Sequence, residues 1–196
     1  MNFLAHLYLS GNDCEIRLGN FIGDYVKGKK FEKYPAKVQT GIKFHRAIDN
    51  LTDRHSSTKI CNEILKPELG RYSGVVTDVL FDHILAKNWS KYSHRDLRNF
   101  TRTFYLQMLQ NYTTLPHDVR RFLPFMIQSN RLYSYKSPEG IHRALEIMSN
   151  NSSLPNKTDY IIMQLQSHID IYSTHFDIVL TDLVDMAKNE FGIELD

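Results

Sequence analysis

Apolar residues recur at helical spacing along almost the whole chain. Phe44, Ile48 and Leu51, for example, fall on one face of a helix. The chain has no Asn-Gly or Asp-Gly turn between alternating apolar and polar residues, the pattern typical of a β-hairpin. The sequence therefore predicts an all-α fold, a single-domain multi-helix bundle over residues 1–196. The expected helices cover residues 2–9, 13–26, 35–54, 57–65, 70–89, 94–112, 117–132, 138–149 and 158–191.

Two of the expected helices begin with capping signals. Ser93 is followed three residues later by Asp96, which predicts that a helix begins just after Ser93. Ser137, Pro138 and Glu139 supply a cap, a proline in the first turn and an early acidic residue, in that order. Both patterns indicate where helices begin.

The composition limits where the chain works and what it binds. A chain of 196 residues buries about 70% of its unfolded surface, enough for a core without cross-links. Its two cysteines, Cys14 and Cys61, form neither a disulfide framework nor a zinc signature, so we expect a reducing, cytoplasmic compartment. The N-terminal segment lacks the basic leader of a signal peptide, and no apolar run approaches the roughly 20 residues that span a bilayer. We therefore expect no membrane partner.

Histidine and aspartate are concentrated in two of the expected helices. His45, Asp49 and Asp53 recur every four residues, and so do Asp78 and Asp82, which stacks each set on one helix face. Imidazole and carboxylate groups together suit Mn, Fe, Zn or Mg ions. Two such faces turned toward each other can hold a divalent metal, so the pattern predicts a metal-dependent hydrolase. The alternative is a structural core histidine beside solvated aspartates.

Several single residues extend or limit this prediction. Asp78 and Asp82 lie in an otherwise apolar helix, where a carboxylate must be paired, protonated or metal-bound, because an isolated buried charge is costly. Asp82 and His83 are adjacent, so they point about 100° apart and cannot share one ion unless the helix is distorted. Asp24 follows a glycine at an expected helix end, where it can reach inward as a further ligand. His6 stays open between a ligand and a core residue.

The positive charge is concentrated in one segment, although the formal net charge of the chain is only +2. Residues 24–46 carry seven lysine or arginine residues and two acidic ones, whereas residues 170–196 carry seven acidic residues and one lysine. The small net charge predicts no nucleic-acid partner. The basic segment predicts a docking surface for an acidic partner or a phosphate, with a solvated face as the alternative.

Several longer motifs run in order through most of the chain. They are NFLAHLYLSG near the N-terminus, GNFIGD ending at Asp24, GIKFHRAID ending at Asp49, TDRH from Thr52 to His55, FDH from Phe81 to His83, Trp89, and SPEGIHRALEIMS from Ser137 to Ser149. Together they resemble the acyl carrier protein phosphodiesterase family. The resemblance implies an all-helical, HD-domain-like fold similar to that of HD-type metal-dependent phosphohydrolases. It also implies hydrolysis of the phosphodiester that joins 4′-phosphopantetheine to a serine of holo acyl carrier protein.

The resemblance also implies a cofactor and a set of site residues. The cofactor is a divalent cation, typically Mn²⁺, and Mg²⁺ and Fe²⁺ are its alternatives. The metal-site residues it implies are Asp24, His45, Asp49, Asp78, Asp82 and His83. It implies Arg46 as a phosphate contact, and we expect Lys27 to help balance the charge that develops on the phosphoryl oxygens. Asp53 or Asp82, left free of metal, is expected to orient the attacking water or assist proton transfer.

The partner surface is the last expectation. Lys29, Lys30 and Lys33 are expected to dock the acidic carrier protein. The family tends toward a tryptophan before the SPEG segment and arginines after it, whereas this chain has NRLY at residues 130–133 and two asparagines at 150–151. Two alternatives to the carrier-protein reaction stay open. One is the same metal chemistry on a small nucleotide or other phosphate ester, and the other is a non-catalytic helical binding protein.

Overall fold

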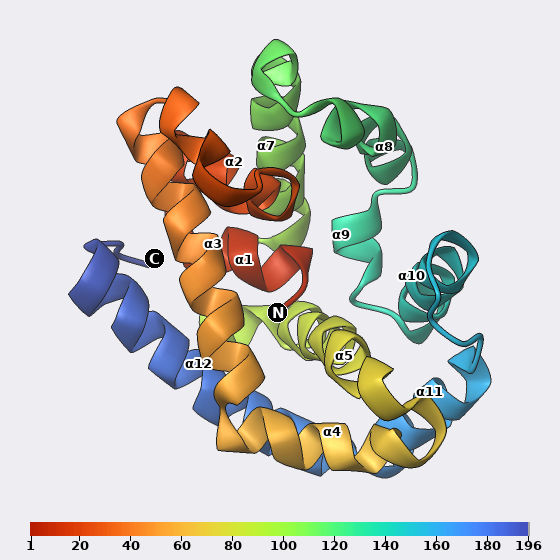
Figure 1. Ribbon diagram of the computed structural model, residues 1–196. Coiled ribbons are helices and arrows are strands. Elements are labelled where there is room, and N and C mark those ends of the chain that lie inside the picture. The colour runs from red at the N-terminus through yellow and green to blue at the C-terminus, as the bar shows by residue number, and fades with distance from the viewer. Residues whose placement is uncertain (196) are drawn as a thin grey trace.

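The computed structural model describes residues 1–195, which form twelve α-helices and four short 3₁₀ turns, with no strand among them (Figure 1). The prediction of an all-α fold is confirmed. Within the described part of the chain, no helix is both long enough and apolar enough to cross a membrane. Asp196, the last residue of the acidic C-terminal segment, lies outside the described residues. The elements are α1 (Phe3–Leu9), α2 (Cys14–Ile22), η1 (Gly23–Tyr25), η2 (Gly28–Lys33), α3 (Ala36–Arg54), α4 (Ser56–Leu69), η3 (Gly70–Tyr72), α5 (Ser73–Lys87), α6 (Trp89–Tyr92), α7 (Leu97–Gln110), η4 (Tyr112–Thr114), α8 (His117–Gln128), α9 (Arg131–Ser134), α10 (Pro138–Asn151), α11 (Thr158–Ser167) and α12 (Ile169–Phe191).

Some helix boundaries differ from those expected. The helix expected over 13–26 ends at Ile22 and continues as the 3₁₀ turn η1. The helix expected over 158–191 is two helices, α11 and α12, which break at His168. The helix expected over 70–89 begins as the 3₁₀ turn η3 and becomes α-helical only at Ser73. The apolar spacing continues through each of these breaks, so it does not reveal them.

The two capping signals had different outcomes. The start at Ser137 is confirmed, because its hydroxyl accepts a hydrogen bond from the Gly140 backbone N–H at 3.1 Å. The expected start just after Ser93 is wrong, because α7 begins at Leu97 with Asp96 as its N-cap. The Asp96 carboxylate accepts from the Asn99 N–H at 3.1 Å, and aspartate is a strong N-cap without help from a capping box.

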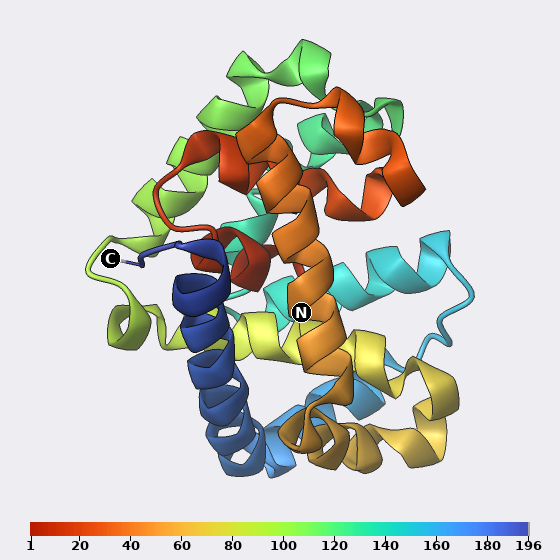
Figure 2. The ribbon, with the colours of Figure 1, turned by 60° about the vertical axis from the view of Figure 1, so that its left-hand side comes forward.

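Helices α2 and α3 pack closely because two glycines face each other. A Cβ on Gly19 would lie 2.1 Å from the carbonyl oxygen of Val38 and 2.9 Å from the Cα of Gly41. A Cβ on Gly41 would lie 2.1 Å from the carbonyl oxygen of Ile16. Larger residues at either position would push the two backbones apart. Since η1 follows α2 directly, this contact holds Asp24 over α3. On its other side α3 runs alongside α12 (Figure 2), where the rings of Phe44 and Phe191 lie 4.7 Å apart between centroids.

Helix α1 lies in the middle of the fold, packed against α2, α5 and α12 (Figure 1). Its leucines are buried, but a helix of seven residues is too short to be stable alone. Asp82 of α5 caps its N-terminus: the carboxylate accepts hydrogen bonds from the backbone N–H groups of Leu4 at 2.7 Å and Ala5 at 3.0 Å. This cap from a distant helix fixes α1, and with it the position of His6.

Candidate metal centre

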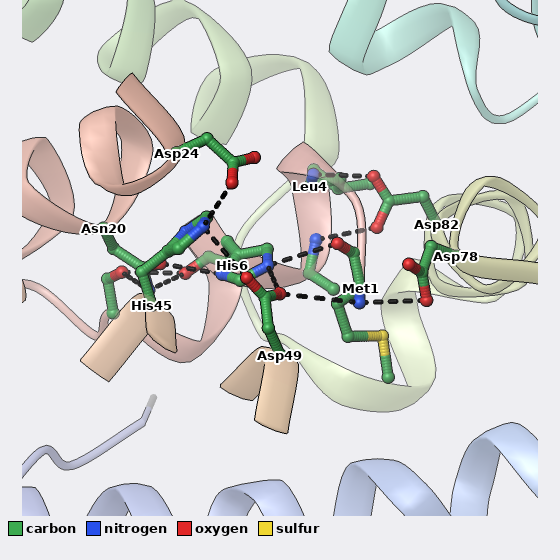
Figure 3. A network of polar contacts seen from close by, with 11 residues as sticks. Met1, Leu4, His6, Asn20, Asp24, His45, Asp49, Asp78 and Asp82 are labelled. Atoms are coloured by element: carbon green, nitrogen blue, oxygen red, sulfur yellow. Dashed lines mark hydrogen bonds and ion pairs between the residues drawn. The ribbon is translucent and has the colours of Figure 1, made fainter. Parts of the chain in front are cut away.

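Side chains from α1 and α3 converge at one point of the fold. His6, His45 and Asp49, here called the triad, each place a ligand atom within 4.8 Å of the others, close enough to hold one metal ion. Asp49 Oδ1 lies 3.1 Å from His6 Nε2, and its Oδ2 lies 3.1 Å from His45 Nε2 (Figure 3). The two imidazole rings stack with their centroids 4.2 Å apart. One carboxylate therefore faces both histidines from the same side.

His6 is oriented by a buried asparagine of α2. Its Nδ1 donates a hydrogen bond to Asn20 Oδ1 at 2.8 Å, and Asn20 Nδ2 donates to the His6 carbonyl at 2.8 Å and to Ser10 Oγ at 2.9 Å. A proton on Nδ1 leaves the lone pair on Nε2, which is the atom that faces Asp49. A second hydrogen bond that fixes the ring and its tautomer is the usual companion of a metal-ligating histidine.

Asp24 joins the triad from η1. Its Oδ1 lies 3.5 Å from His45 Nε2, and its side chain is largely exposed (Figure 3). The residue before it must be glycine, because a Cβ on Gly23 would lie 2.2 Å from Cγ of the His45 ring. The glycine therefore lets the η1 backbone approach His45 closely enough for Asp24 to reach it.

The charges of these groups depend on one another. Burial lowers the pKa of His45, but the carboxylates of Asp24 and Asp49 raise it more, to about 9. Burial raises the pKa of Asp49, but the protonated His45 holds it well below its usual range. The pKa of His6 is lowered, mainly by burial. The cluster thus favours ionised carboxylates, a neutral His6 and a cation near them.

His45 has nitrogens that lack aligned hydrogen bonds. Its Nε2 lies near oxygens of Asp49 and Asp24, yet among the described residues neither buried ring nitrogen makes a hydrogen bond of good geometry. A buried polar atom without a partner is costly, and a divalent cation between the nitrogen and the carboxylates would satisfy it. The donor set of two imidazoles and two carboxylates therefore fits a divalent metal.

Asp78 and Asp53 border the triad. The amino group of Met1 lies 3.0 Å from Asp78 Oδ1 and 4.0 Å from Asp49 Oδ1, so the two carboxylates approach the same positive charge (Figure 3). Asp53 lies one turn beyond Asp49 on α3, and its pKa is raised by burial and by the nearby carboxylates of Asp78 and Asp49. The Met1 amino group thus brings Asp49 of α3 and Asp78 of α5 to one positive charge, while the metal-site or catalytic roles of Asp49, Asp53 and Asp78 stay predictions.

Asp82 and His83 are not brought into the triad. Asp82 is fully buried, and its two oxygens accept the α1 N–H groups already described, while burial raises its pKa to about 7. His83 Nδ1 donates to the carbonyl of Tyr135 at 2.7 Å, and its pKa is lowered by burial. Asp82 lies one turn after Asp78 on α5, where α1 begins, so its carboxylate accepts from the α1 backbone and does not face the triad. The role of Asp82 and His83 as metal ligands stays a prediction.

The predicted phosphate and partner contacts lie at the basic turn after η1. Arg46 Nη2 donates to the carbonyls of Val26 at 2.8 Å and Gly28 at 3.0 Å, and its guanidinium lies over the Phe31 ring. The lysines predicted for phosphate and carrier-protein contact are all exposed: Lys27, Lys29, Lys30 and Lys33. The structure thus links Arg46 to this turn, while the roles of all five residues stay predictions.

Two residues of the site were not identified from the sequence. His6 stayed undecided, because its partners lie on α2 and α3 and its placement depends on the Asp82 cap of α1. Asn20 gave no signal of its own, since a single asparagine in a helix has no characteristic spacing.

The fold and the site together define an all-helical protein with a histidine and carboxylate cluster suited to a divalent cation. The chain belongs to the acyl carrier protein phosphodiesterase family, whose model matches residues 1–183. An acyl carrier protein phosphodiesterase of Enterobacter sp. (strain 638) is 30% identical over 194 residues, which cover 97% of this chain and 99% of the relative. One from Escherichia coli O6:H1 is 31% identical over 180 residues, covering 90% of this chain and 92% of the relative. No solved structure matches the chain.

Proposed function

We propose that this chain hydrolyses the phosphodiester bond that joins 4′-phosphopantetheine to a serine of holo acyl carrier protein. The observation that carries the proposal is the convergence of His6, His45 and Asp49 in a member of the acyl carrier protein phosphodiesterase family. The relatives that match almost the full chain are named acyl carrier protein phosphodiesterases.

The triad and Asp24 would hold the divalent cation. Two imidazoles beside carboxylates suit Mn²⁺ or Fe²⁺ better than Mg²⁺, which prefers an all-oxygen shell, so we propose Mn²⁺. When bound, such an ion lowers the pKa of a water from 15.7 toward roughly 7 and neutralises charge on the phosphodiester oxygens. His6 meets it as a neutral imidazole, whereas His45 must first lose its proton. Asp78 is the nearest further carboxylate, and Asp82 and His83 would have to leave their backbone partners to join.

The remaining residues supply acid–base and charge contacts. Asp53 is the carboxylate beside the triad whose pKa is raised, which suits a group that takes a proton from the attacking water. Arg46 and Lys27 would balance the charge that develops on the phosphoryl oxygens. The hydrogen bonds of Arg46 to the Val26 and Gly28 carbonyls both use Nη2, and a guanidinium has five N–H donors, which supports this role.

The partner would approach over the exposed lysines of η2. Lys29, Lys30 and Lys33 lie in the turn that Arg46 anchors, close in sequence to Asp24. A positively charged surface beside the site steers an acidic protein and raises its association rate. We therefore propose these lysines as the docking contacts of the carrier protein.

The test combines metal binding with turnover. Wild type, His6→Ala and Asp49→Asn are compared for Mn²⁺ binding by calorimetry and for release of 4′-phosphopantetheine from holo carrier protein by mass spectrometry. We expect both variants to lose Mn²⁺ binding and at least about 100-fold in kcat/KM.

A matched control comes from a histidine outside the site. His142 lies 3.5 Å from Glu146 and 3.4 Å from Asp159 on the surface, so His142→Ala removes a similar histidine–carboxylate pair and should leave both measurements unchanged. Near wild-type turnover in both triad variants would contradict the proposal. So would a wild type that binds Mn²⁺ and cleaves a small phosphodiester but never releases phosphopantetheine, a result that favours a small phosphate ester as the substrate.

A further inference from the structure

A large apolar groove opens next to the triad. It has a volume of about 850 Å³, which is in the range of sites that bind small molecules. Helices α8 and α10, which form much of it, lie on the side of the fold opposite α12 (Figure 1). Its aromatic and aliphatic lining includes Phe3, Tyr25, Val75, Phe122, Phe125 and Ile147.

The groove lies beside the metal site and shares a lining residue with it. Phe3 lines both the groove and the small cavity formed by His6, Asp24 and His45. Tyr25, the residue after Asp24, packs its ring 5.5 Å from that of Phe122, and Phe3 lies 6.1 Å from the same ring, between centroids. A molecule whose phosphate lies at the triad can therefore extend along these aromatic rings into the groove.

The groove exposes apolar side chains that a ligand would cover. Phe125 is 71% exposed, Val75 43% and Ile147 38%, although they come from three different helices. Exposed apolar residues gathered around one concave surface are typical of a binding site, whereas single scattered ones are ordinary. The polar edge includes Arg71 and Arg131, whose guanidinium N–H groups can donate to amide carbonyls. Ser129 and Asn151 also line it; their own donors bond to helix carbonyls, and their oxygens can accept from amide N–H groups. The chemistry fits an amide-containing chain that ends in a hydrocarbon.

We propose that the groove binds the hydrocarbon chain that a carrier protein bears as a thioester at the far end of its phosphopantetheine arm. The inference rests on the proposed function, because the arm must have its phosphodiester at the triad. The scissile phosphate is then held beside Asp24 and the arm passes Phe3 and Tyr25. Val75, Phe125 and Ile147 contact the acyl chain and discriminate acylated from unacylated carrier protein.

The test compares two carrier-protein substrates that differ only in the acyl chain. Wild type is supplied with Mn²⁺ and given unacylated or octanoyl carrier protein, and kcat/KM is measured for each. We expect the octanoyl substrate to be preferred by about tenfold or more, because methylene groups in an apolar pocket each add binding energy. In Phe125→Ser and Val75→Asp the preference should fall to about threefold or less.

The test includes a control variant outside the groove, and two results would overturn the proposal. Leu106→Ser replaces an apolar residue of α7 that is 61% exposed and lies outside the groove lining, so the preference should persist. Equal kcat/KM for both substrates in wild type would overturn the proposal. An equal loss on both substrates in Phe125→Ser would also overturn it, because the groove would then contact the arm or the carrier protein itself.

A binding measurement distinguishes failure of the proposed function from failure of the groove as an acyl site. If wild type releases no phosphopantetheine from either substrate, titration with octanoyl-pantetheine by calorimetry still reports on the groove. Binding that is weakened about tenfold by Phe125→Ser and unchanged by Leu106→Ser would support the groove as an acyl site while rejecting the reaction. The absence of binding to wild type would overturn the groove as well.

Discussion

The substitution Asp82→Ala tests whether Asp82 of α5 acts as a metal ligand or as a cap for the N-terminus of α1. A metal ligand can be removed with little effect on folding, because the apolar packing is untouched. The structure gives Asp82 a different position, since it accepts the N–H groups of Leu4 and Ala5 in a fully buried environment. We therefore expect Asp82→Ala to reduce stability, whereas Asp49→Asn should affect mainly the metal.

The size of the effect follows from the two hydrogen bonds. Each buried N–H left without a partner costs roughly 1–3 kcal/mol, so Asp82→Ala should lower the free energy of unfolding by about 2–6 kcal/mol. That is a large part of the 5–15 kcal/mol typical of a folded domain. Asp49 is half-buried and pairs with two histidines, so its replacement by asparagine should cost about 1 kcal/mol or less.

Two measurements check this reasoning. Urea unfolding followed by circular dichroism gives the midpoint and slope for each variant, and calorimetry gives Mn²⁺ affinity where the protein is folded. We expect Asp82→Ala to shift the urea midpoint down at an unchanged slope, and Asp49→Asn to keep the midpoint while losing Mn²⁺. An Asp82→Ala protein that keeps its midpoint but no longer binds Mn²⁺ would refute the reasoning and make Asp82 a ligand.

Three further predictions concern the surroundings of the triad. Gly23→Ala should weaken Mn²⁺ binding about tenfold or more, because its Cβ would overlap the His45 ring, whereas Gly74→Ala, whose Cβ would meet nothing closer than 3.7 Å, should bind normally in the same titration. The raised pKa of His45, about 9 against 6.5 when unfolded, contributes stability that is present below pH 6.5 and lost as the pH rises through 9. In metal-free protein the free energy of unfolding should therefore fall over that range by up to about 3 kcal/mol relative to His45→Gln, as measured by urea unfolding with a chelator. Reversing the charge of Lys29 and Lys30 should lower kcat/KM on carrier protein about tenfold at low salt. The loss should shrink at 1 M salt, where the Debye length is about 3 Å against about 10 Å at 0.1 M. An equal loss on a small phosphodiester would place these lysines at the phosphate instead.

The part of the site that the sequence predicts is the part that helix geometry determines locally. His45 and Asp49 are four residues apart on α3, so their convergence follows from the helix alone. Asp24 was expected at a helix end beside a glycine, and the close approach of Gly23 to the His45 ring explains why position 23 is a glycine. Helix periodicity likewise predicts the all-α fold, because it depends only on neighbours along the chain.

The part that the sequence does not predict depends on contacts between distant segments. Asp78 and Asp82 have the same spacing as His45 and Asp49, yet Asp82 meets the N-terminus of α1, more than 70 residues away in the sequence. Spacing within α5 cannot show which of its turns lies beside α1. His6 was left undecided for the same reason, since its ligand geometry exists only once α1 is docked.

The docking of α1 therefore couples stability to metal binding. The helix carries His6, it is too short to persist alone, and its N-terminus is held by Asp82. If α1 is docked in only a fraction of the molecules, the apparent Kd for Mn²⁺ rises by the inverse of that fraction. A variant such as Asp82→Ala can then weaken Mn²⁺ binding without touching the ion, but only in proportion to the stability it loses. A ligand variant such as Asp49→Asn weakens Mn²⁺ binding much more than its small loss of stability accounts for. A metal ligand and a helix cap are therefore distinguished by plotting the loss of Mn²⁺ affinity against the loss of unfolding free energy.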